Sequence, residues 1–155
     1  MAVTPEASLP AETADKDYRN LSIIIPAFNE EDGILATLEN LRGHFPAAEI
    51  IVVDDGSKDL TAERARSFSG VRVLAHRFNR GYGGALKTGM RQAERELIAW
   101  FDADNEHQPE YLQEMVALME RDKLAAVLGQ RPRSVSVVRG VGKYMIRFLA
   151  RLLKV

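Results

Sequence analysis

Short apolar segments alternate with segments of helical periodicity along most of the chain, and this alternation restricts the fold more than any other feature. The strand-like segments are 21–25, 49–53, 71–75, 96–101 and 124–129. Between them, apolar residues recur at helical spacing in 30–42, 59–68, 81–95 and from Pro109 onward. Strands that alternate with helices in this way form βαβ units. The pattern predicts an α/β fold with a mostly parallel sheet and helices on both faces.

The composition limits the size and the environment of this fold. The chain has 155 residues, no cysteine and a formal net charge of −1. This is an ordinary size for one domain. Disulfides and thiolate metal sites are excluded, and a reducing compartment is compatible with the sequence. The net charge gives no general argument for nucleic-acid binding, so we expect no nucleic-acid partner. No apolar run approaches the roughly 20 residues that span a bilayer.

The first 20 residues differ from the rest of the chain. They are rich in Ala, Glu, Pro and Thr and have neither the basic nor the apolar region of a secretory signal. Such a composition is typical of disordered segments. We therefore expect 1–20 to be a disordered leader and the folded domain to begin at residue 21.

Polar clusters follow the first four predicted strands, at the point where each strand ends. They read PAFNE, DDGS, HRFNRGYGG and DADNEH in chain order. In open parallel sheets, ligands bind outside the carboxyl ends of the strands. Because these ends meet at one edge of the sheet, the sequence predicts that the four clusters converge on one site.

Two of these clusters have a structural and a functional interpretation. Asp54 and Asp55 fit a capped turn between strand and helix, and they also fit a carboxylate that accepts hydrogen bonds from a ribose or a base edge. The glycines near residues 81–89 permit close approach to a ligand, and equally permit tight packing of a helix on the sheet. Their spacing lacks the ending of a phosphate loop.

The DADNEH cluster places Asp102 and Asp104 where both side chains can turn toward one point outside the sheet. Mg²⁺ and Mn²⁺ take oxygen ligands and commonly bind one or two carboxylates together with substrate phosphates. A solvated acidic loop is the alternative. A phosphatase of the haloacid dehalogenase type is disfavoured, because that class has Thr or Val where Glu106 stands and carries its motif on the first strand.

Four segments together resemble family 2 glycosyltransferases, in particular the dolichol- or polyprenol-phosphate sugar transferases. They are IIIPAFNEE (23–31), IIVVDDGSKD (50–59), NRGYGGALKTGM (79–90) and WFDADNEHQPE (100–110). The resemblance covers about 21–155. It implies a GT-A fold, a nucleotide-diphosphate sugar donor and a divalent cation, Mg²⁺ or Mn²⁺. It also implies that 21–136 forms the nucleotide-sugar-binding domain.

The resemblance further assigns roles to individual residues. Asp102 and Asp104 would hold the metal and the diphosphate, with Asp104 also catalytic, and Arg131 would be a catalytic ligand of phosphate. The nucleotide-sugar site would comprise Pro26, Phe28, Glu30, Val53, Asp55, Asp102 and Ala103. Relatives often have Tyr at the position of Phe28, Gln at that of Glu106, and Ser at that of Gln130.

The resemblance suggests an inverting transfer of the sugar. No Asp, Glu or His follows Arg131 to serve as a general base. This favours an acceptor that is already ionised, such as a polyprenyl or dolichyl phosphate, over a hydroxyl group. Two hypotheses remain open: an active glycosyltransferase, and a nucleotide-sugar-binding module that a partner or homo-oligomerisation must complete.

The final segment, 137–155, combines apolar residues at helical spacing with four basic residues spaced by four, Arg139, Lys143, Arg147 and Arg151. Basic amphipathic helices of this kind lie in membrane interfaces. A helix packed on the sheet, with a solvated basic face, is the alternative. With the lipid phosphate acceptor, the pattern predicts a peripheral protein at the cytoplasmic face of the membrane.

Overall fold

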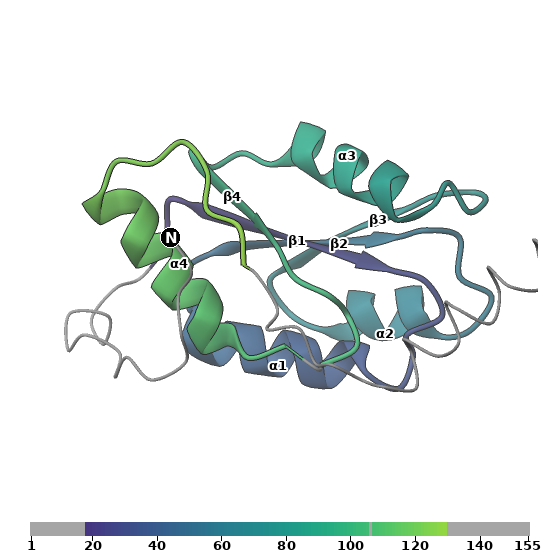
Figure 1. Ribbon diagram of the computed structural model, residues 1–155. Coiled ribbons are helices and arrows are strands. Elements are labelled where there is room, and N and C mark those ends of the chain that lie inside the picture. The colour runs from purple at the N-terminus through teal and green to yellow at the C-terminus, as the bar shows by residue number, and fades with distance from the viewer. Residues whose placement is uncertain (1–17, 106, 130–155) are drawn as a thin grey trace, which may run out of the picture. The chain divides into compact units, whose positions relative to one another are not determined.

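The computed structural model describes residues 18–105 and 107–129. Within them, strands and helices alternate as the sequence predicts (Figure 1). The strands are β1 (Leu21–Ala27), β2 (Glu49–Asp54), β3 (Val71–Ala75) and β4 (Leu97–Trp100), and the helices are α1 (Ile34–His44), α2 (Thr61–Ser67), α3 (Tyr82–Gln92) and α4 (Pro109–Arg121). Residues 18–127 belong to one compact unit, to which the following description refers.

The four strands form one parallel sheet in the order β3-β2-β1-β4. The two central strands are almost fully buried, because helices cover both faces of the sheet. β1 lies between β2 and β4, with Ile24 opposite both Ile51 and Trp100. The carboxyl ends of β1, β2 and β4 are therefore neighbours, which places three of the four polar clusters side by side.

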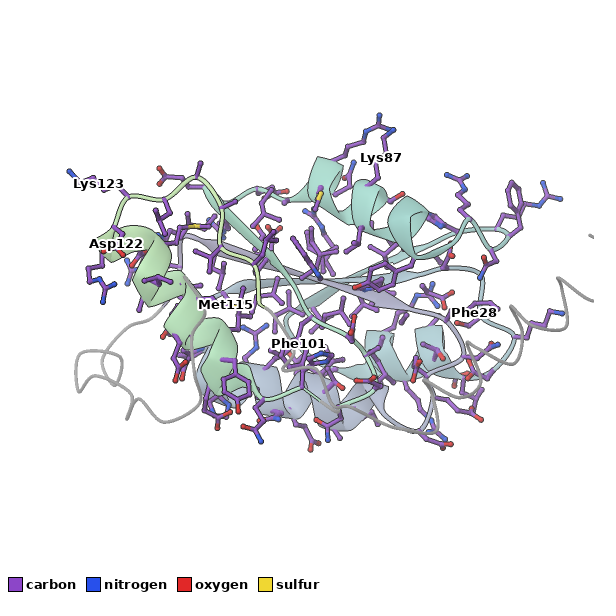
Figure 2. All side chains as sticks on the ribbon, viewed as in Figure 1. Phe28, Lys87, Phe101, Met115, Asp122 and Lys123 are labelled. Atoms are coloured by element: carbon purple, nitrogen blue, oxygen red, sulfur yellow. The ribbon has the colours of Figure 1, made fainter. Side chains whose placement is uncertain are left out.

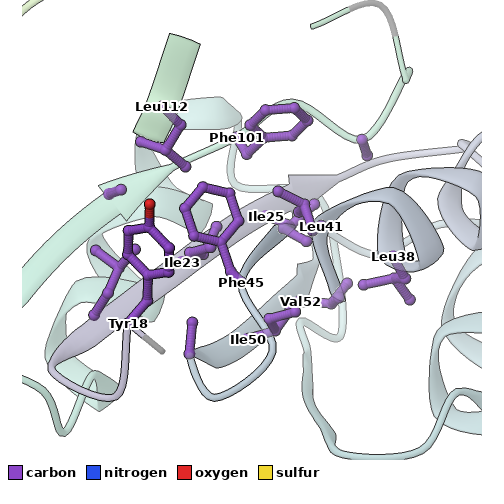
Figure 3. Packing of buried hydrophobic residues seen from close by; sticks show 14 of the residues in the cluster. Tyr18, Ile23, Ile25, Leu38, Leu41, Phe45, Ile50, Val52, Phe101 and Leu112 are labelled. Atoms are coloured by element: carbon purple, nitrogen blue, oxygen red, sulfur yellow. The ribbon is translucent and has the colours of Figure 1, made fainter. Parts of the chain in front are cut away.

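Alternate residues of the central strands contribute to two separate cores. On one face, Ile24, Ile51 and Val53 pack with Ala85 of α3. On the other face lies the larger core with α1, α2 and α4 (Figures 1 and 3). Its residues include Ile23, Ile25, Leu38, Leu41, Phe45, Ile50, Val52, Phe101 and Leu112. The prediction of a parallel sheet with helices on both faces is confirmed.

Gly89 allows α3 to lie unusually close to the sheet. A Cβ atom at this position would be 2.3 Å from Cγ2 of Ile24 and 3.2 Å from Cγ2 of Val53. Real Cβ atoms do not approach other atoms so closely, so any larger residue would push the helix away. For Gly89, the packing interpretation of the glycine-rich segment is therefore correct.

Two details of the sequence prediction are wrong. The segment 124–129 is apolar but forms no strand, and Leu124 is 41% exposed. A strand exists only where its backbone pairs with a neighbour, and apolar composition does not supply one. At the other end, Tyr18 falls in the predicted leader, yet it is buried and packs edge-on against Phe45 with ring centroids 4.7 Å apart. The packed domain therefore includes Tyr18.

Several predictions concern residues outside the described ranges. These are the leader before Tyr18, Glu106, Gln130, Arg131 and the basic segment 137–155. Within the described ranges, no helix has the length and apolar character needed to cross a membrane.

Candidate functional site

A cavity of about 350 Å³ opens at the carboxyl ends of β1, β2 and β4. Residues from all four polar clusters line it, as the sequence predicts. The lining residues are Pro26, Ala27, Phe28, Glu30, Asp55, Asn79, Tyr82, Asp102, Ala103 and Asp104, together with Ala85 of α3. Of the residues expected at the nucleotide, only Val53 is not among them, because its side chain belongs to the core beneath α3. Figure 2 shows Phe28 at this end of the molecule, far from Asp122 and Lys123 at the end of α4.

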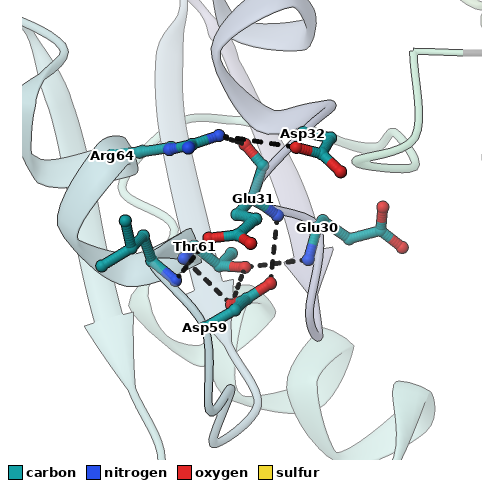
Figure 4. Close-up of polar contacts among 7 residues, drawn as sticks. Glu30, Glu31, Asp32, Asp59, Thr61 and Arg64 are labelled. Atoms are coloured by element: carbon teal, nitrogen blue, oxygen red, sulfur yellow. Dashed lines mark hydrogen bonds and ion pairs between the residues drawn. The ribbon is translucent and has the colours of Figure 1, made fainter.

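Hydrogen bonds between two loops fix the wall of this cavity (Figure 4). The Glu30 N–H donates to Oγ1 of Thr61 at 2.8 Å, and the same hydroxyl donates to Oδ1 of Asp59 at 2.5 Å. The Glu31 N–H donates to Oδ2 of Asp59 at 3.2 Å. Thr61 is fully buried at the start of α2. The loop that carries Glu30 is therefore tied to α2 and holds its backbone position without a ligand.

Glu30 lies in a negative environment. Burial raises the pKa of its carboxyl group, and the charges of Asp104, Asp59 and Asp102 raise it further. Repulsion of this kind requires the carboxylates to be close to one another. The cavity therefore has an excess of negative charge on one side, which a cation would offset.

The two adjacent aspartates of DDGS have different roles. Oδ1 of Asp54 accepts a hydrogen bond of 3.3 Å from the Ser57 N–H, so this residue stabilises the turn. Gly56 has a φ angle of 77°, and a Cβ atom there would be 2.8 Å from the backbone of Phe78. The backbone of this turn therefore lies directly against the backbone of the loop after β3. Asp55 alone reaches the cavity, so the structural interpretation fits Asp54 and leaves Asp55 available to a ligand.

The Asp55 carboxylate accepts hydrogen bonds from residues to which the sequence analysis assigned no role. Its Oδ1 accepts hydrogen bonds from Nδ1 of His76 at 2.6 Å and from the Arg80 N–H at 2.9 Å. Nε2 of His76 lies 2.9 Å from Oγ1 of Thr88. Burial alone would raise the pKa of Asp55, but the hydrogen bonds from His76 and from the Arg80 N–H outweigh it and lower the pKa. The Asp55 carboxylate is therefore ionised and fixed in orientation.

Asp102 and Asp104 point toward a common position. Nδ1 of His107 lies 3.5 Å from Oδ2 of Asp102 and 3.8 Å from Oδ1 of Asp104. The Tyr82 hydroxyl donates a hydrogen bond of 2.8 Å to Oδ1 of Asp102. The ring of His107 packs edge-on against Phe101, with centroids 5.8 Å apart. Both carboxylates therefore lie around the same nitrogen of His107.

This donor set fits a divalent cation that substrate phosphates help to hold. Within 18–105 and 107–129, no three His, Cys, Asp or Glu side chains form a ready-made metal site. Mg²⁺ and Mn²⁺ do not need one, because they commonly bind one or two carboxylates plus phosphate oxygens and water. Two converging carboxylates in an acidic cavity meet that requirement.

The sequence analysis predicted that the clusters containing His76, Asn79, Tyr82 and His107 reach this site, but it assigned no role to these four residues. His76 is the first residue after β3, so its place at the carboxyl edge was a usable signal. Tyr82 is the first residue of α3, and its reach to Asp102 depends on how that helix crosses the sheet. No local pattern in the sequence reports that crossing.

Comparison with known proteins gives concordant results. A family model described as glycosyl transferase family 2 matches residues 22–152. The chain is 36% identical over 140 residues to an uncharacterised protein of Methanocaldococcus jannaschii, with 84% of this chain and 57% of that protein aligned. It is 30% identical over 156 residues to the UDP-N-acetylglucosamine–dolichyl-phosphate N-acetylglucosaminyltransferase of Methanococcus voltae, with 84% and 62% aligned.

Solved structures agree with the fold. The mannosyltransferase PcManGT of Pyrobaculum calidifontis, solved in complex with GDP-mannose and Mn²⁺, superposes with a TM-score of 0.58 at 25% identity. The superposition covers 64% of this chain and 32% of that one. The expectation of a GT-A fold is therefore confirmed. The chain spans between 32% and 62% of the length of these three proteins.

Proposed function

Because the chain belongs to glycosyl transferase family 2, we propose that it binds a nucleotide-diphosphate sugar in the cavity and transfers the sugar, with inversion, to a polyprenyl or dolichyl phosphate. The observation that carries this proposal is the meeting of Phe28, Asp55, Asp102 and Asp104 in one cavity at the carboxyl ends of the strands. An aromatic ring, a fixed carboxylate and a converging pair of carboxylates suit the base, the nucleoside and the diphosphate of such a donor.

Each part of the cavity has a chemical role in this proposal. Phe28 is 42% exposed and offers its ring to the base. A divalent cation, Mg²⁺ or Mn²⁺, held by Asp102 and Asp104 would stabilise the negative charge that develops on the leaving nucleoside diphosphate. Ala103, which lies between these two residues in the sequence, lines the same cavity. Pro26 and Glu30 complete the side of the cavity formed by β1 and its loop.

The nature of the acceptor decides which catalytic groups the chain must supply. A phosphate acceptor is ionised near neutral pH and attacks without a strong general base. The chain then has to position the acceptor and exclude water. Arg131 is the proposed cationic partner of the phosphates, on the basis of its place in the sequence. The relative from Methanococcus voltae is named for transfer to dolichyl phosphate, which supports this class of acceptor.

A lipid acceptor places the reaction at a membrane surface. The sequence pattern of 137–155, with Arg139, Lys143, Arg147 and Arg151 on one face, supports peripheral attachment at the cytoplasmic face. Flotation with liposomes that contain anionic lipid tests this. We expect the chain to float with them at low salt and a variant with these four residues changed to Gln to remain at the bottom. Failure of the parent chain to float would contradict the attachment, and equal flotation of both proteins would contradict the part that these four residues play in it.

Transfer itself is tested with the purified chain, polyprenyl phosphate in detergent, and a panel of radiolabelled UDP-, GDP- and dTDP-sugars. We expect one donor to yield labelled lipid with Mn²⁺ and none with EDTA. Asp104→Asn should abolish the product, whereas Glu39→Gln, on the exposed face of α1, should not. Donor binding without any transfer would indicate a binding module, and the absence of both would contradict the proposed function.

A further inference from the structure

The loop between β3 and α3, residues 76–81, lies at the same edge of the sheet as the cavity (Figure 1). Asn79 of this loop and Tyr82 directly after it line the cavity. Arg77, Phe78 and Arg80 do not line it, and all three are exposed. The loop therefore forms part of the cavity wall and also presents three side chains to the surroundings beside the cavity.

Phe78 is the most prominent of these side chains. It is 62% exposed, more than any other aromatic residue that the structure describes. The guanidinium of Arg80 lies over its ring, 5.4 Å from the centroid, in a cation–π arrangement. Single exposed apolar residues are common on soluble proteins. Here, however, the exposed ring and a positive charge are held together at one point of the surface.

The backbone of this loop is fixed at both ends. The His76 N–H donates to the carbonyl of Asp54 at 2.8 Å, and the Arg80 N–H donates to Oδ1 of Asp55 at 2.9 Å. The exposure of Phe78 is therefore a property of an ordered loop. A partner that covers the ring need not order the chain first, which removes one of the usual costs of binding.

The charge around Phe78 is positive, although most of the folded chain is acidic. All 22 acidic residues but only 14 of the 21 basic ones precede residue 124. Arg77 and Arg80 flank Phe78, and the exposed Lys58 follows the Gly56 turn, whose backbone lies against that of Phe78. Within 18–105 and 107–129, none of these three cations forms an ion pair. They are therefore available to an anionic surface.

An exposed aromatic ring among basic side chains suits an anionic bilayer. The ring enters the boundary between headgroups and acyl chains, and the cations lie against lipid phosphates. A protein partner would need a contiguous surface much larger than one loop. A bilayer needs no such area, because it forms around whatever side chain enters it. The combination of Phe78 with three cations therefore favours a lipid surface.

We propose that the loop between β3 and α3 docks on an anionic bilayer, with the Phe78 ring inserted and Arg77, Arg80 and Lys58 against lipid phosphates. The cavity beside this loop would then face the surface of the bilayer. This contact is additional to the segment 137–155, since stable peripheral attachment commonly takes two signals. That the bilayer also supplies the acceptor rests on the proposed function, whereas the contact itself does not.

Site-specific fluorescence tests the insertion of Phe78. Because the chain has no cysteine, Phe78→Cys provides a single thiol for an environment-sensitive fluorophore. Met90→Cys, at a 40% exposed apolar position of α3, is the matched control. We expect a blue shift at position 78 with vesicles of phosphatidylcholine and phosphatidylglycerol, and none at position 90. No shift at position 78, or equal shifts at both positions, would overturn the proposal.

The basic residues are tested by the partition of the unlabelled chain onto the same vesicles. Changing both Arg77→Gln and Arg80→Gln should weaken this partition at low salt by about fivefold for each residue. Arg91→Gln, at an exposed position of α3, should weaken it less. Partition of the double variant equal to that of the parent would overturn the part that the arginines play.

Calorimetric titration with UDP and Mn²⁺ separates this surface from the nucleotide site. The double variant should bind UDP as the parent does, because the Arg80 N–H that contacts Asp55 is retained. Loss of UDP binding as large as the loss of partition would show that the arginines serve the cavity, and would overturn the docking surface. A parent chain that binds the vesicles but no nucleotide would contradict the proposed function and leave the docking surface intact.

Discussion

The Tyr82 hydroxyl donates a hydrogen bond of 2.8 Å to Oδ1 of Asp102, which joins the first residue of α3 to the loop that follows β4. Burial raises the pKa of this phenol, and the hydrogen bond to Asp102 and the charges of Asp102 and Asp104 raise it further. Tyr82 is therefore a neutral donor at neutral pH. The bond closes one side of the cavity and fixes the orientation of the Asp102 carboxylate.

Tyr82→Phe should weaken nucleotide binding in the presence of Mn²⁺ by about three- to tenfold, since one hydrogen bond that orients a ligand group is lost. The ring and its packing remain, so the free energy of unfolding should change little. Calorimetric titration with UDP and Mn²⁺ measures the first quantity, and urea denaturation measures the second. Equal or tighter binding by the variant would show that the bond does not organise the site.

Gly89→Ala should destabilise the protein by about 1–3 kcal/mol, because its Cβ atom would overlap Ile24 and force α3 away from the sheet. Gly83 provides a matched control in the same helix, since a Cβ atom there meets nothing within 4 Å. Gly83→Ala should stabilise the protein by about 0.5 kcal/mol through the lower entropy of the unfolded chain.

Urea denaturation of the two glycine variants gives both values on one scale. A similar free energy of unfolding for Gly89→Ala and the parent would mean that α3 does not lie as close to the sheet as the contact with Ile24 requires. It would also place the N-terminus of α3, with Tyr82, differently relative to Asp102.

Glu30→Gln should stabilise the protein at neutral pH by about 0.5 kcal/mol, the size expected for a partly exposed charge interaction. The pKa of Glu30 is raised in the folded state, so its ionisation opposes folding. The ionised carboxylate destabilises the protein at pH values above the pKa that Glu30 has in the folded state. Below the ordinary value of 4.5 the destabilisation is absent, because the group is protonated in both the folded and the unfolded state.

The pH dependence distinguishes this effect from a change in packing. Thermal unfolding of the parent and of Glu30→Gln across the acid range should show the two melting temperatures converging as the pH falls. A constant difference at every pH would contradict the electrostatic origin. The effect of the substitution would then come from the packing or hydrogen bonding of the side chain.

The sequence was most informative where one local pattern determines one structural outcome. The apolar runs of β1, β2 and β4 and the polar residues that follow them predicted both the parallel sheet and the meeting of Phe28, Asp55 and Asp102 at one edge. This worked because parallel strands direct their carboxyl ends to the same side. It required no knowledge of side-chain positions.

The sequence was least informative where contacts depend on distant residues. The hydrogen bonds of Asp55 to His76 and of Asp102 to Tyr82 join residues 21 and 20 positions apart. The first depends on the pairing of β2 with β3, and the second depends on how α3 crosses the sheet. The segment 124–129 has the composition of a strand without a partner to pair with. Tyr18 was assigned to the leader because its burial depends on Phe45, which lies beyond β1 and α1.

Calorimetric titration of Mn²⁺ into the chain in the presence of excess UDP, repeated with Asp104→Asn, tests most directly whether this cavity holds a nucleoside diphosphate together with a divalent cation. We predict cation binding that depends on the nucleotide and is weakened at least about tenfold in Asp104→Asn, because the variant loses one of two charged oxygen ligands. Glu39→Gln should bind as the parent does. Equal binding of Mn²⁺ by the parent and Asp104→Asn would contradict the assignment of the site. Mn²⁺ binding that is the same with and without UDP would also contradict it.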